Sequence, residues 1–90
     1  MWVKTQDGKT VIEINCFNTR KEEDKYIIRG LRVADNRWYR LAAYSSEGKA
    51  LDVFELMQVF INKCKTFELN KNFSSKFLSF IFEMPEESSV

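Results

Sequence analysis

A single amphipathic stripe within residues 47–64 is the feature that most constrains the fold of this 90-residue chain. Its apolar members follow one another at steps of three or one residue, which places them on one face of an α-helix. Ser45 and Ser46 precede the stripe, and either hydroxyl can accept a bond from an unpaired amide at a helix start. We therefore predict a helix of about 20 residues, roughly 30 Å long, whose apolar face must be covered. The members of the stripe are Ala50, Val53, Phe54, Met57, Phe60, Ile61 and Cys64.

The chain before this helix alternates between apolar and polar residues, as β-strands with one buried face do. Residues 2–5 and 10–17 flank Asp7 and Gly8. An Asp-Gly pair between two such runs predicts a hairpin, because glycine accepts the positive φ of the turn. The next segments are predicted to be an exposed polar loop, a strand, a turn and another strand, over residues 18–24, 25–33, 34–36 and 37–44.

After the helix the alternation returns at residues 76–84, which predicts a last strand. Pro85 ends this strand, since proline cannot donate to a sheet ladder. Residues 86–90 are predicted to form a flexible acidic tail.

The order ββββ-α-β predicts an α+β fold in one domain, residues 1–90. We expect a curved antiparallel sheet with one long helix packed on one face, because this arrangement buries the helix stripe and the strand faces together. The rows expected beneath the helix are Ile12 with Ile14 and Leu31 with Val33.

Composition narrows the chemistry that the chain can perform. Fourteen basic and 13 acidic residues give a net charge of +1, which excludes a polybasic binder or an acidic mimic as a description of the whole chain. Histidine, the commonest general base and metal ligand, is absent. Two cysteines alone cannot complete a zinc tetrad. Cys16 and Cys64 lie 48 positions apart, unlike the closer spacing of small secreted domains. We expect reduced cysteines, a cytoplasmic location, no metal and no cofactor.

Motifs that are typical of enzymes or membrane proteins are missing from the sequence. Gly8, Gly30 and Gly48 are isolated, so they form no phosphate-binding loop. There is no nucleophile elbow and no Cys-His pair. The acidic run at residues 22–24 favours a solvated loop over acid-base chemistry, which needs carboxylates that converge in a pocket. No apolar run approaches about 18 residues. We expect neither enzymatic activity nor a membrane-spanning segment.

Three segments together resemble a group of small uncharacterised proteins from low-GC Gram-positive bacteria and their phages or mobile elements. They are the Lys-Thr-Gln-Asp-Gly start at residues 4–8, the Tyr-Ser-Ser-Glu helix start at 44–47 and the Phe-Glu-Met-Pro-Glu-Glu end at 82–87. The chain departs from the group at Gly48, where a second acid is usual, and residues 67–77 are longer than usual. The resemblance implies a small cytoplasmic accessory protein of mobile-element origin, with no known activity.

All five arginines fall between residues 20 and 40, where seven basic and four acidic residues give a local charge of +3. Tyr26, Trp38 and Tyr39 are interleaved with them on a predicted hairpin. Arginine beside aromatic residues on exposed strands can bind phosphate, stacked bases or an acidic protein. A solvated face whose aromatics pack over arginine stems shows the same pattern. The candidate partner-binding residues are Arg29, Arg32, Arg37, Trp38 and Arg40.

Seven of the eight phenylalanines fall within residues 54–82, and some apolar residues of this region lie off the predicted core faces. Exposed apolar side chains of this kind mark a partner or dimer surface. The alternative is that residues 66–75 fold back over them. The candidates for self-association are Leu51, Val59, Phe77 and Ile81.

From the sequence we predict a non-enzymatic cytosolic protein-interaction module, with a homodimer as an open alternative. An unidentified protein partner would contact the arginine-aromatic hairpin of residues 26–40 or the apolar edge at Phe77 and Ile81. The alternative function is a small nucleic-acid or nucleotide binder that uses the same hairpin. Its affinity would fall steeply with salt, and a net charge of +1 weighs against strong non-specific binding.

Overall fold

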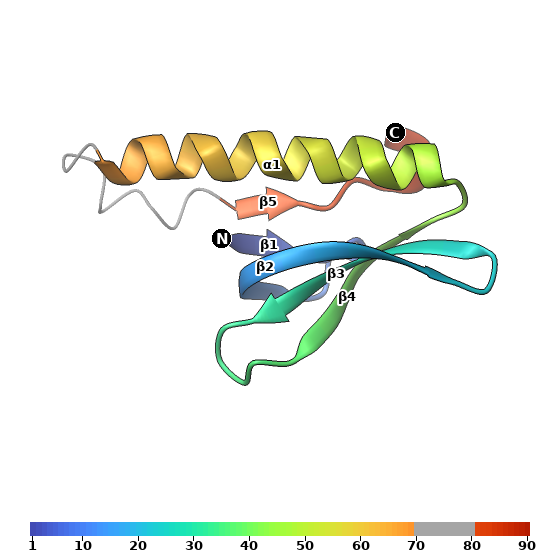
Figure 1. Ribbon diagram of the computed structural model, residues 1–90, viewed down its shortest axis with the longest axis horizontal. Helices are drawn as coiled ribbons and strands as arrows, with labels where there is room; N and C mark the ends of the chain where they lie inside the picture. The colour runs from blue at the N-terminus through green and yellow to red at the C-terminus, as the bar shows by residue number, and fades with distance from the viewer. Residues whose placement is uncertain (70–80) are drawn as a thin grey trace.

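The computed structural model describes residues 1–69 and 81–90. A sheet of five strands lies beneath one long helix that runs along the sheet (Figure 1). This arrangement confirms the predicted α+β fold with a helix packed on one face. The elements in chain order are β1 (Trp2–Lys4), β2 (Val11–Glu22), β3 (Lys25–Arg32), β4 (Trp38–Tyr44), α1 (Glu47–Leu69), β5 (Ile81–Glu83) and a 3-10 turn, η2 (Glu87–Ser89).

The strands stand in the order β4-β3-β2-β1-β5, and the first four pair antiparallel as predicted. β5 pairs parallel to β1, with Trp2 beside Ile81 and Lys4 beside Glu83, so the expectation of a wholly antiparallel sheet is corrected at this edge. The reason is visible in Figure 1, where α1 runs back along the sheet from the end of β4. β5 therefore begins at the same end of the sheet as β1 and follows it in the same direction.

β2 is longer than the sequence predicted. Residues 18–22, which were expected to lie in an exposed loop, continue the strand and pair with β3 as far as Glu22 and Lys25. Only Glu23 and Asp24 form the turn, and Glu23 takes a positive φ of 54°. Polar residues fit a strand here because alternate side chains point to solvent while the backbone pairs. The strands predicted at 25–33 and 37–44 are confirmed to within one residue.

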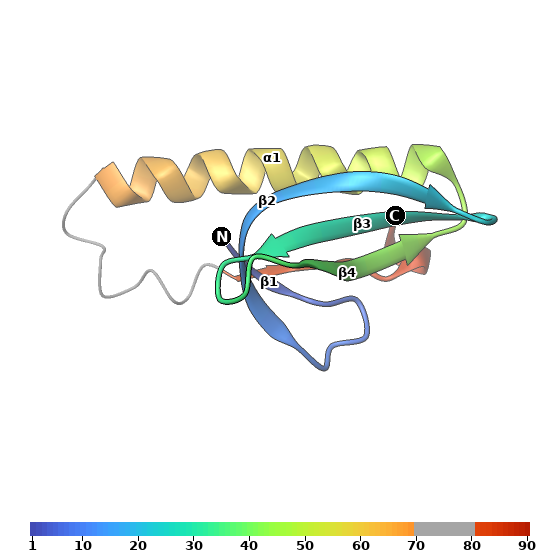
Figure 2. The same cartoon turned by 60° about the horizontal axis from the view of Figure 1, so that its bottom comes forward.

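A bulge between Ile14 and Cys16 divides β2 into a half that pairs with β1 and a half that pairs with β3. A bulge bends a strand and increases its twist, and Figure 2 shows β2 curving strongly as it passes from β1 to β3. The predicted curvature of the sheet therefore has a local cause. Gly30 lies inside this curve, where a Cβ atom would come within 2.7 Å of Ile14 Cγ2.

The core lies between α1 and the inner face of the sheet. Ile12 and Ile14 are buried beneath the helix as predicted, but Leu31 and Val33 are not part of this core, and Val33 is 43% exposed. The row that β3 contributes instead contains Ile28, because the register places the other face of the strand against α1. The fully buried core residues with large side chains are Val3, Ile28, Leu41, Tyr44, Val53 and Met57.

The turn between β1 and β2 is linked to β4 through one residue, Gln6, which uses both its backbone and its side chain. Its backbone N–H donates to the Leu41 carbonyl at 2.9 Å. Its side-chain oxygen accepts from the Ala43 N–H at 3.0 Å, and its side-chain nitrogen donates to the Ala43 and Pro85 carbonyls at 3.1 and 3.3 Å. Gln6 thus takes the place of a neighbouring strand for part of β4.

The C-terminal residues pack on the start of the helix, where the sequence predicted a flexible tail. The Tyr44 hydroxyl donates to the Pro85 carbonyl at 2.7 Å, and the Glu87 carboxylate accepts from the Ser45 N–H at 2.5 Å. Ser46 caps α1 as predicted, since its hydroxyl accepts from the Lys49 N–H at 3.2 Å. Burial raises the pKa of Tyr44 to about 12, with a contribution from the nearby Glu87 charge. The bonds from Ser45 lower the pKa of Glu87.

Candidate functional site

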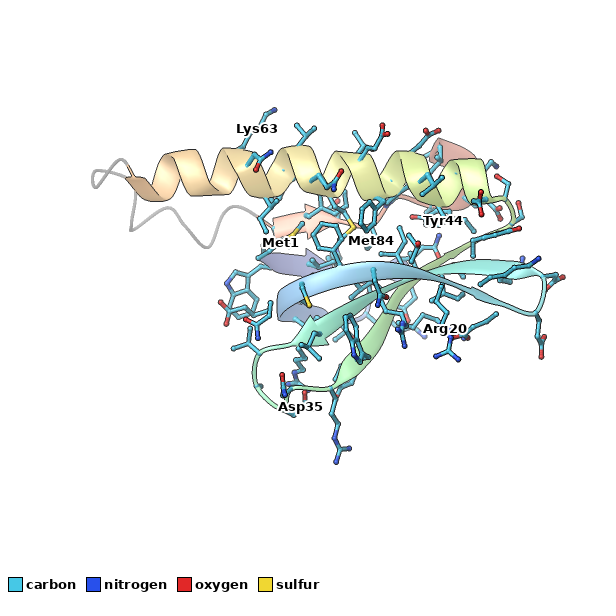
Figure 3. The ribbon with its side chains drawn as sticks, viewed as in Figure 1. Met1, Arg20, Asp35, Tyr44, Lys63 and Met84 are labelled. Atoms are coloured by element: carbon cyan, nitrogen blue, oxygen red, sulfur yellow. The ribbon has the colours of Figure 1, made fainter. Side chains whose placement is uncertain are left out.

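The sheet face turned away from α1, which we call the outer face, carries a group of polar residues from β2, β3 and β4. Phe17 packs edge-to-face on Phe54 of the helix at 5.0 Å, so the residues beside Phe17 in the strand point outward. Figure 3 shows Arg20 on this side, whereas Tyr44 and Met84 lie between the two layers. By register the outer-face residues of β2, β3 and β4 include Cys16, Asn18, Arg20, Glu22, Lys25, Ile27, Arg29, Leu31, Trp38, Arg40 and Ala43.

Trp38 and Arg29 form a stack on the outer face, at the β4 edge of the sheet. The Arg29 guanidinium lies over the Trp38 ring at 4.9 Å from its centroid, and its Nε donates to the Asn18 side-chain oxygen at 3.2 Å. Trp38 remains 42% exposed. A guanidinium stacked on indole keeps its charge while its orientation is fixed. The pair therefore presents a positioned cation beside an accessible aromatic surface.

Glu22 holds two further arginines of the outer face. The terminal nitrogen of Arg40 lies 2.6 Å from Glu22 Oε1, and Arg20 Nε lies 3.9 Å from Glu22 Oε2. Their side chains are about 60% exposed, so these pairs contribute about 0–1 kcal/mol to stability. Arg20, Arg29, Arg40 and Glu22 together carry a charge of +2.

The arginine stems also cover an apolar side chain. Ile27 is 1% exposed although it lies outside the core beneath α1. Its cross-strand partners are Arg20 and Ala43, and Arg40 must pass over this row to reach Glu22. Long charged side chains commonly bury their methylene stems on apolar surface while the charged end stays in water. The outer face is therefore an ordered surface and not a set of free side chains.

Two of the five predicted partner-binding residues lie elsewhere. Arg32 lies over the Tyr39 ring at 5.5 Å, on the inner side of β3 and β4, and is 3.9 Å from Asp35. The Tyr39 hydroxyl donates to the Asp35 carboxylate, and this bond lowers the pKa of Asp35. Figure 3 shows Asp35 in the turn between β3 and β4. Arg37 belongs to this turn and is exposed. The structure brings together Arg29, Trp38 and Arg40 only.

Sequence reasoning missed Arg20, Asn18 and Glu22 because it placed residues 18–24 in a loop. The signal that could have found them is the alternation of Phe17 and Thr19 with these polar residues, which continues the strand pattern. The charge of Arg20 was noted in the sequence, but only the extension of β2 shows that it shares a face with Arg40 through Glu22.

The structure describes three of the four residues predicted for self-association, and they lie on different parts of α1 and β5. Val59 lines a groove of about 340 Å³ between α1 and β5, together with Leu56, Phe60 and Phe82. Ile81 is exposed on β5, while Leu51 lies nearer the start of the helix, where it lines a small cavity together with Tyr26. Phe77 lies outside the described residues, as does the greater part of the strand predicted at 76–84.

A second, larger groove of about 520 Å³ lies between β4 and the β1–β2 turn. Its walls include Thr5, Thr10, Arg32, Tyr39 and Arg40. Within residues 1–63 and 81–90 no charged side chain is buried. The same residues hold no cluster of three potential metal ligands, and α1, as far as it is described, is not apolar enough to cross a membrane. No protein-family model, curated protein or solved structure matches the chain.

Proposed function

We propose that this protein is a non-enzymatic interaction module that binds an acidic protein segment on its outer face. The observation that carries the proposal is the Trp38–Arg29 stack, in which an exposed aromatic ring and a fixed cation stand side by side. Tryptophan and arginine are the residues that most often dominate the energy of protein interfaces. Arg20 and Arg40 extend the positive charge along the same face.

The proposed location is the cytoplasm. Its support is the spacing of the two cysteines in the sequence and the exposed thiol of Cys16 on the outer face. An exposed free thiol is compatible with a reducing compartment, in which structural disulfides are rare. The resemblance to small mobile-element proteins supports the same location.

The nucleic-acid alternative uses the same residues, and two features weigh against it. Sheets that bind single strands stack two or three bases on a series of aromatic rings, whereas Trp38 is the one aromatic residue that β2, β3 and β4 place on the outer face. The chain has a net charge of +1, and Glu22 neutralises part of the arginine charge. A protein partner with an acidic and an apolar group matches the surface better.

The test is affinity capture with quantitative mass spectrometry, performed with three forms of the protein. We expect a partner that wild type and Arg37→Ala enrich equally and that Trp38→Ala/Arg40→Ala enriches at least about tenfold less, since two interface anchors contribute more than about 1.4 kcal/mol. Arg37 is the matched control because it is an exposed arginine off the outer face. Circular dichroism and urea unfolding verify that the double variant folds. Retained capture by a folded double variant contradicts the proposal.

Fluorescence anisotropy with a labelled single-stranded oligonucleotide tests the alternative. We expect no saturable binding at physiological salt. Binding that falls steeply with salt and disappears in Trp38→Ala/Arg40→Ala would assign the outer face to nucleic acid instead.

A further inference from the structure

β4 is an edge strand of the sheet, and its two halves differ in the hydrogen bonding of their outward backbone groups. At Leu41 and Ala43 the outward backbone groups are bonded to Gln6. No described residue bonds to the outward backbone groups of Trp38 and Arg40. Unpaired donors and acceptors on an edge strand are a template for another strand. Half of the edge is therefore closed by the protein itself and half is open.

The direction of the open groups follows from the pairing of β3 with β4. The Arg32 N–H donates to the Arg37 carbonyl at 2.8 Å, so Arg37 faces β3, and so does Tyr39, which lies opposite Gly30. Backbone groups alternate in direction along an antiparallel strand. Those of Trp38 and Arg40 consequently point away from the sheet, and the side chains of the same two residues lie on the outer face.

The space beside this open half is the larger groove, between β4 and the β1–β2 turn. A strand added along Trp38 and Arg40 would place alternate side chains on the outer face, directly beside the indole and the guanidinium. The side chain between them would point to the groove, whose walls carry Tyr39, Thr5 and Thr10. The groove thus has room for the inner side chain of such a strand.

Charge decides which strand fits. A residue opposite Arg40 would meet a guanidinium that has one carboxylate partner, Glu22, and a residue opposite Trp38 would lie close to Arg29. A second copy of this chain, paired through its own β4, would bring the arginines of two outer faces onto one continuous sheet, which like charges oppose. An acidic segment adds the opposite charge.

From these observations we infer that β4 binds an extended acidic segment of a partner protein by strand addition, with an acidic residue opposite Arg40 and an apolar residue two positions away opposite Trp38. The inference rests on the proposed function and adds to it the mode of binding and the pattern of the partner. Main-chain bonds to an edge strand give affinity, and alternate side chains give specificity.

The probe is a fluorescent seven-residue peptide, Thr-Glu-Thr-Val-Thr-Glu-Thr, which offers a glutamate on either side of valine and so fits both strand directions. Anisotropy titrations use the full chain. We expect saturable binding that weakens at least about fivefold in Arg40→Gln and stays unchanged in Arg37→Gln. A peptide with lysine in place of glutamate is expected not to bind.

Two N-methylated peptides separate strand addition from attraction by side chains alone. One peptide carries methyl groups on the valine and glutamate amides, and the other carries the same number on threonine amides. In an antiparallel addition the valine and glutamate amides face β4, and in a parallel addition the threonine amides do. We expect the peptide whose methyl groups block the N–H groups that pair with β4 to bind at least about tenfold more weakly. In the other peptide the methyl groups point to solvent, and we expect its binding to stay within about twofold of that of the unmethylated peptide. The weaker of the two peptides therefore also reports the direction of the added strand. This pair of peptides is the matched control, because composition and charge are identical.

Each outcome bears on the inference. If both methylated peptides bind equally while Trp38→Ala/Arg40→Ala lowers binding, the outer face binds acidic segments but strand addition is wrong. If the unmethylated peptide does not bind, the inference is overturned, and the capture experiment above still decides the proposed function. A dimer in light scattering that Arg40→Gln strengthens would show that a second copy occupies β4, and would also overturn it.

Discussion

The inner and outer faces of the same sheet are built from different interactions. On the inner face Val3, Ile28 and Met57 are fully buried between the strands and α1. On the outer face the ordered groups are Arg29 on Trp38 and two arginines on Glu22, all of them in contact with water. Burial of an apolar side chain contributes about 1.5–3 kcal/mol, whereas an exposed ion pair contributes about 0–1 kcal/mol. We therefore expect substitutions on the inner face to change mainly stability and substitutions on the outer face to change mainly binding.

The largest effect is expected from Met57→Ala, which removes a fully buried side chain at the centre of the helix stripe. Lost transfer energy and the cavity left behind lower the free energy of unfolding by about 2–5 kcal/mol. Urea denaturation measures this change. The control is Leu56→Ala, since Leu56 is exposed on the same helix; an equal loss in both variants would contradict the assignment of the core.

Gly30→Ala tests the close approach of strands on the inner face. The new methyl group would lie 2.7 Å from Ile14 Cγ2 and 3.1 Å from Leu41 Cδ1, both of them buried side chains. Overpacking of this kind lowers the free energy of unfolding by about 1–3 kcal/mol. Thermal unfolding should show the loss, and Gly48→Ala serves as control because nothing lies within 4 Å of that position. A neutral Gly30→Ala would mean that β2 can shift at this point.

Gln6→Ala tests the link between the β1–β2 turn and β4. It removes the side-chain bonds to Ala43 and Pro85, and we expect the free energy of unfolding to fall by about 1–2 kcal/mol. Hydrogen exchange at the Ala43 amide should become faster. Gln6→Glu keeps the acceptor for the Ala43 N–H but loses the donor, so we expect an intermediate loss of stability. Equal stability of wild type and both variants would show that Gln6 does not hold β4.

A pH dependence is expected from Tyr44, whose hydroxyl donates to Pro85. Its pKa is raised from 10.0 to about 12 in the folded protein. A raised folded pKa means that the stabilisation is fully present below pH 10 and is lost as the pH rises towards about 12. Unfolding measured across this window should show a loss in wild type that is smaller in Tyr44→Phe. A parallel course of the two curves would contradict the role of this hydroxyl.

The smallest change in stability is expected from Glu22→Gln on the outer face. The exposed pairs with Arg20 and Arg40 disappear, yet the free energy of unfolding should change by less than about 1 kcal/mol. Affinity for the acidic probe peptide should rise instead, because two arginines lose their competing carboxylate, and added salt should reduce the gain. A large loss of stability without a gain in affinity would assign the outer face a structural role.

Much of the fold could be predicted because its patterns are local. The helix stripe places Ala50, Val53 and Met57 on one face at any tertiary arrangement, and Asp7-Gly8 marks the first turn, where Gly8 has a φ of 74°. The face of β3 that meets the helix could not be predicted. Ile27 is buried on the outer face and Ile28 is buried under α1. Because both are apolar, alternation alone does not predict which of them meets the helix.

The candidate site could be predicted only in part, because a local sequence pattern does not say which side of the sheet a residue occupies. Clustering of arginine with Trp38 is visible in the sequence, but a local charge count cannot assign residues to faces. Arg32 and Arg29 are three positions apart on one strand and therefore point to opposite sides of the sheet. Arg20 joins the outer face only because β2 continues through a polar stretch to pair with β3.

The sequence by itself determined the order of the elements, the apolar stripe of α1 and the concentration of arginine between residues 20 and 40. These depend on spacing along the chain, which is fixed covalently. The tertiary structure decided which face of β3 is covered, how β5 pairs with β1, and how Gln6 closes half of β4. Those features depend on strand register and on hydrogen bonds between residues up to 79 positions apart, and only the packed chain brings such partners together.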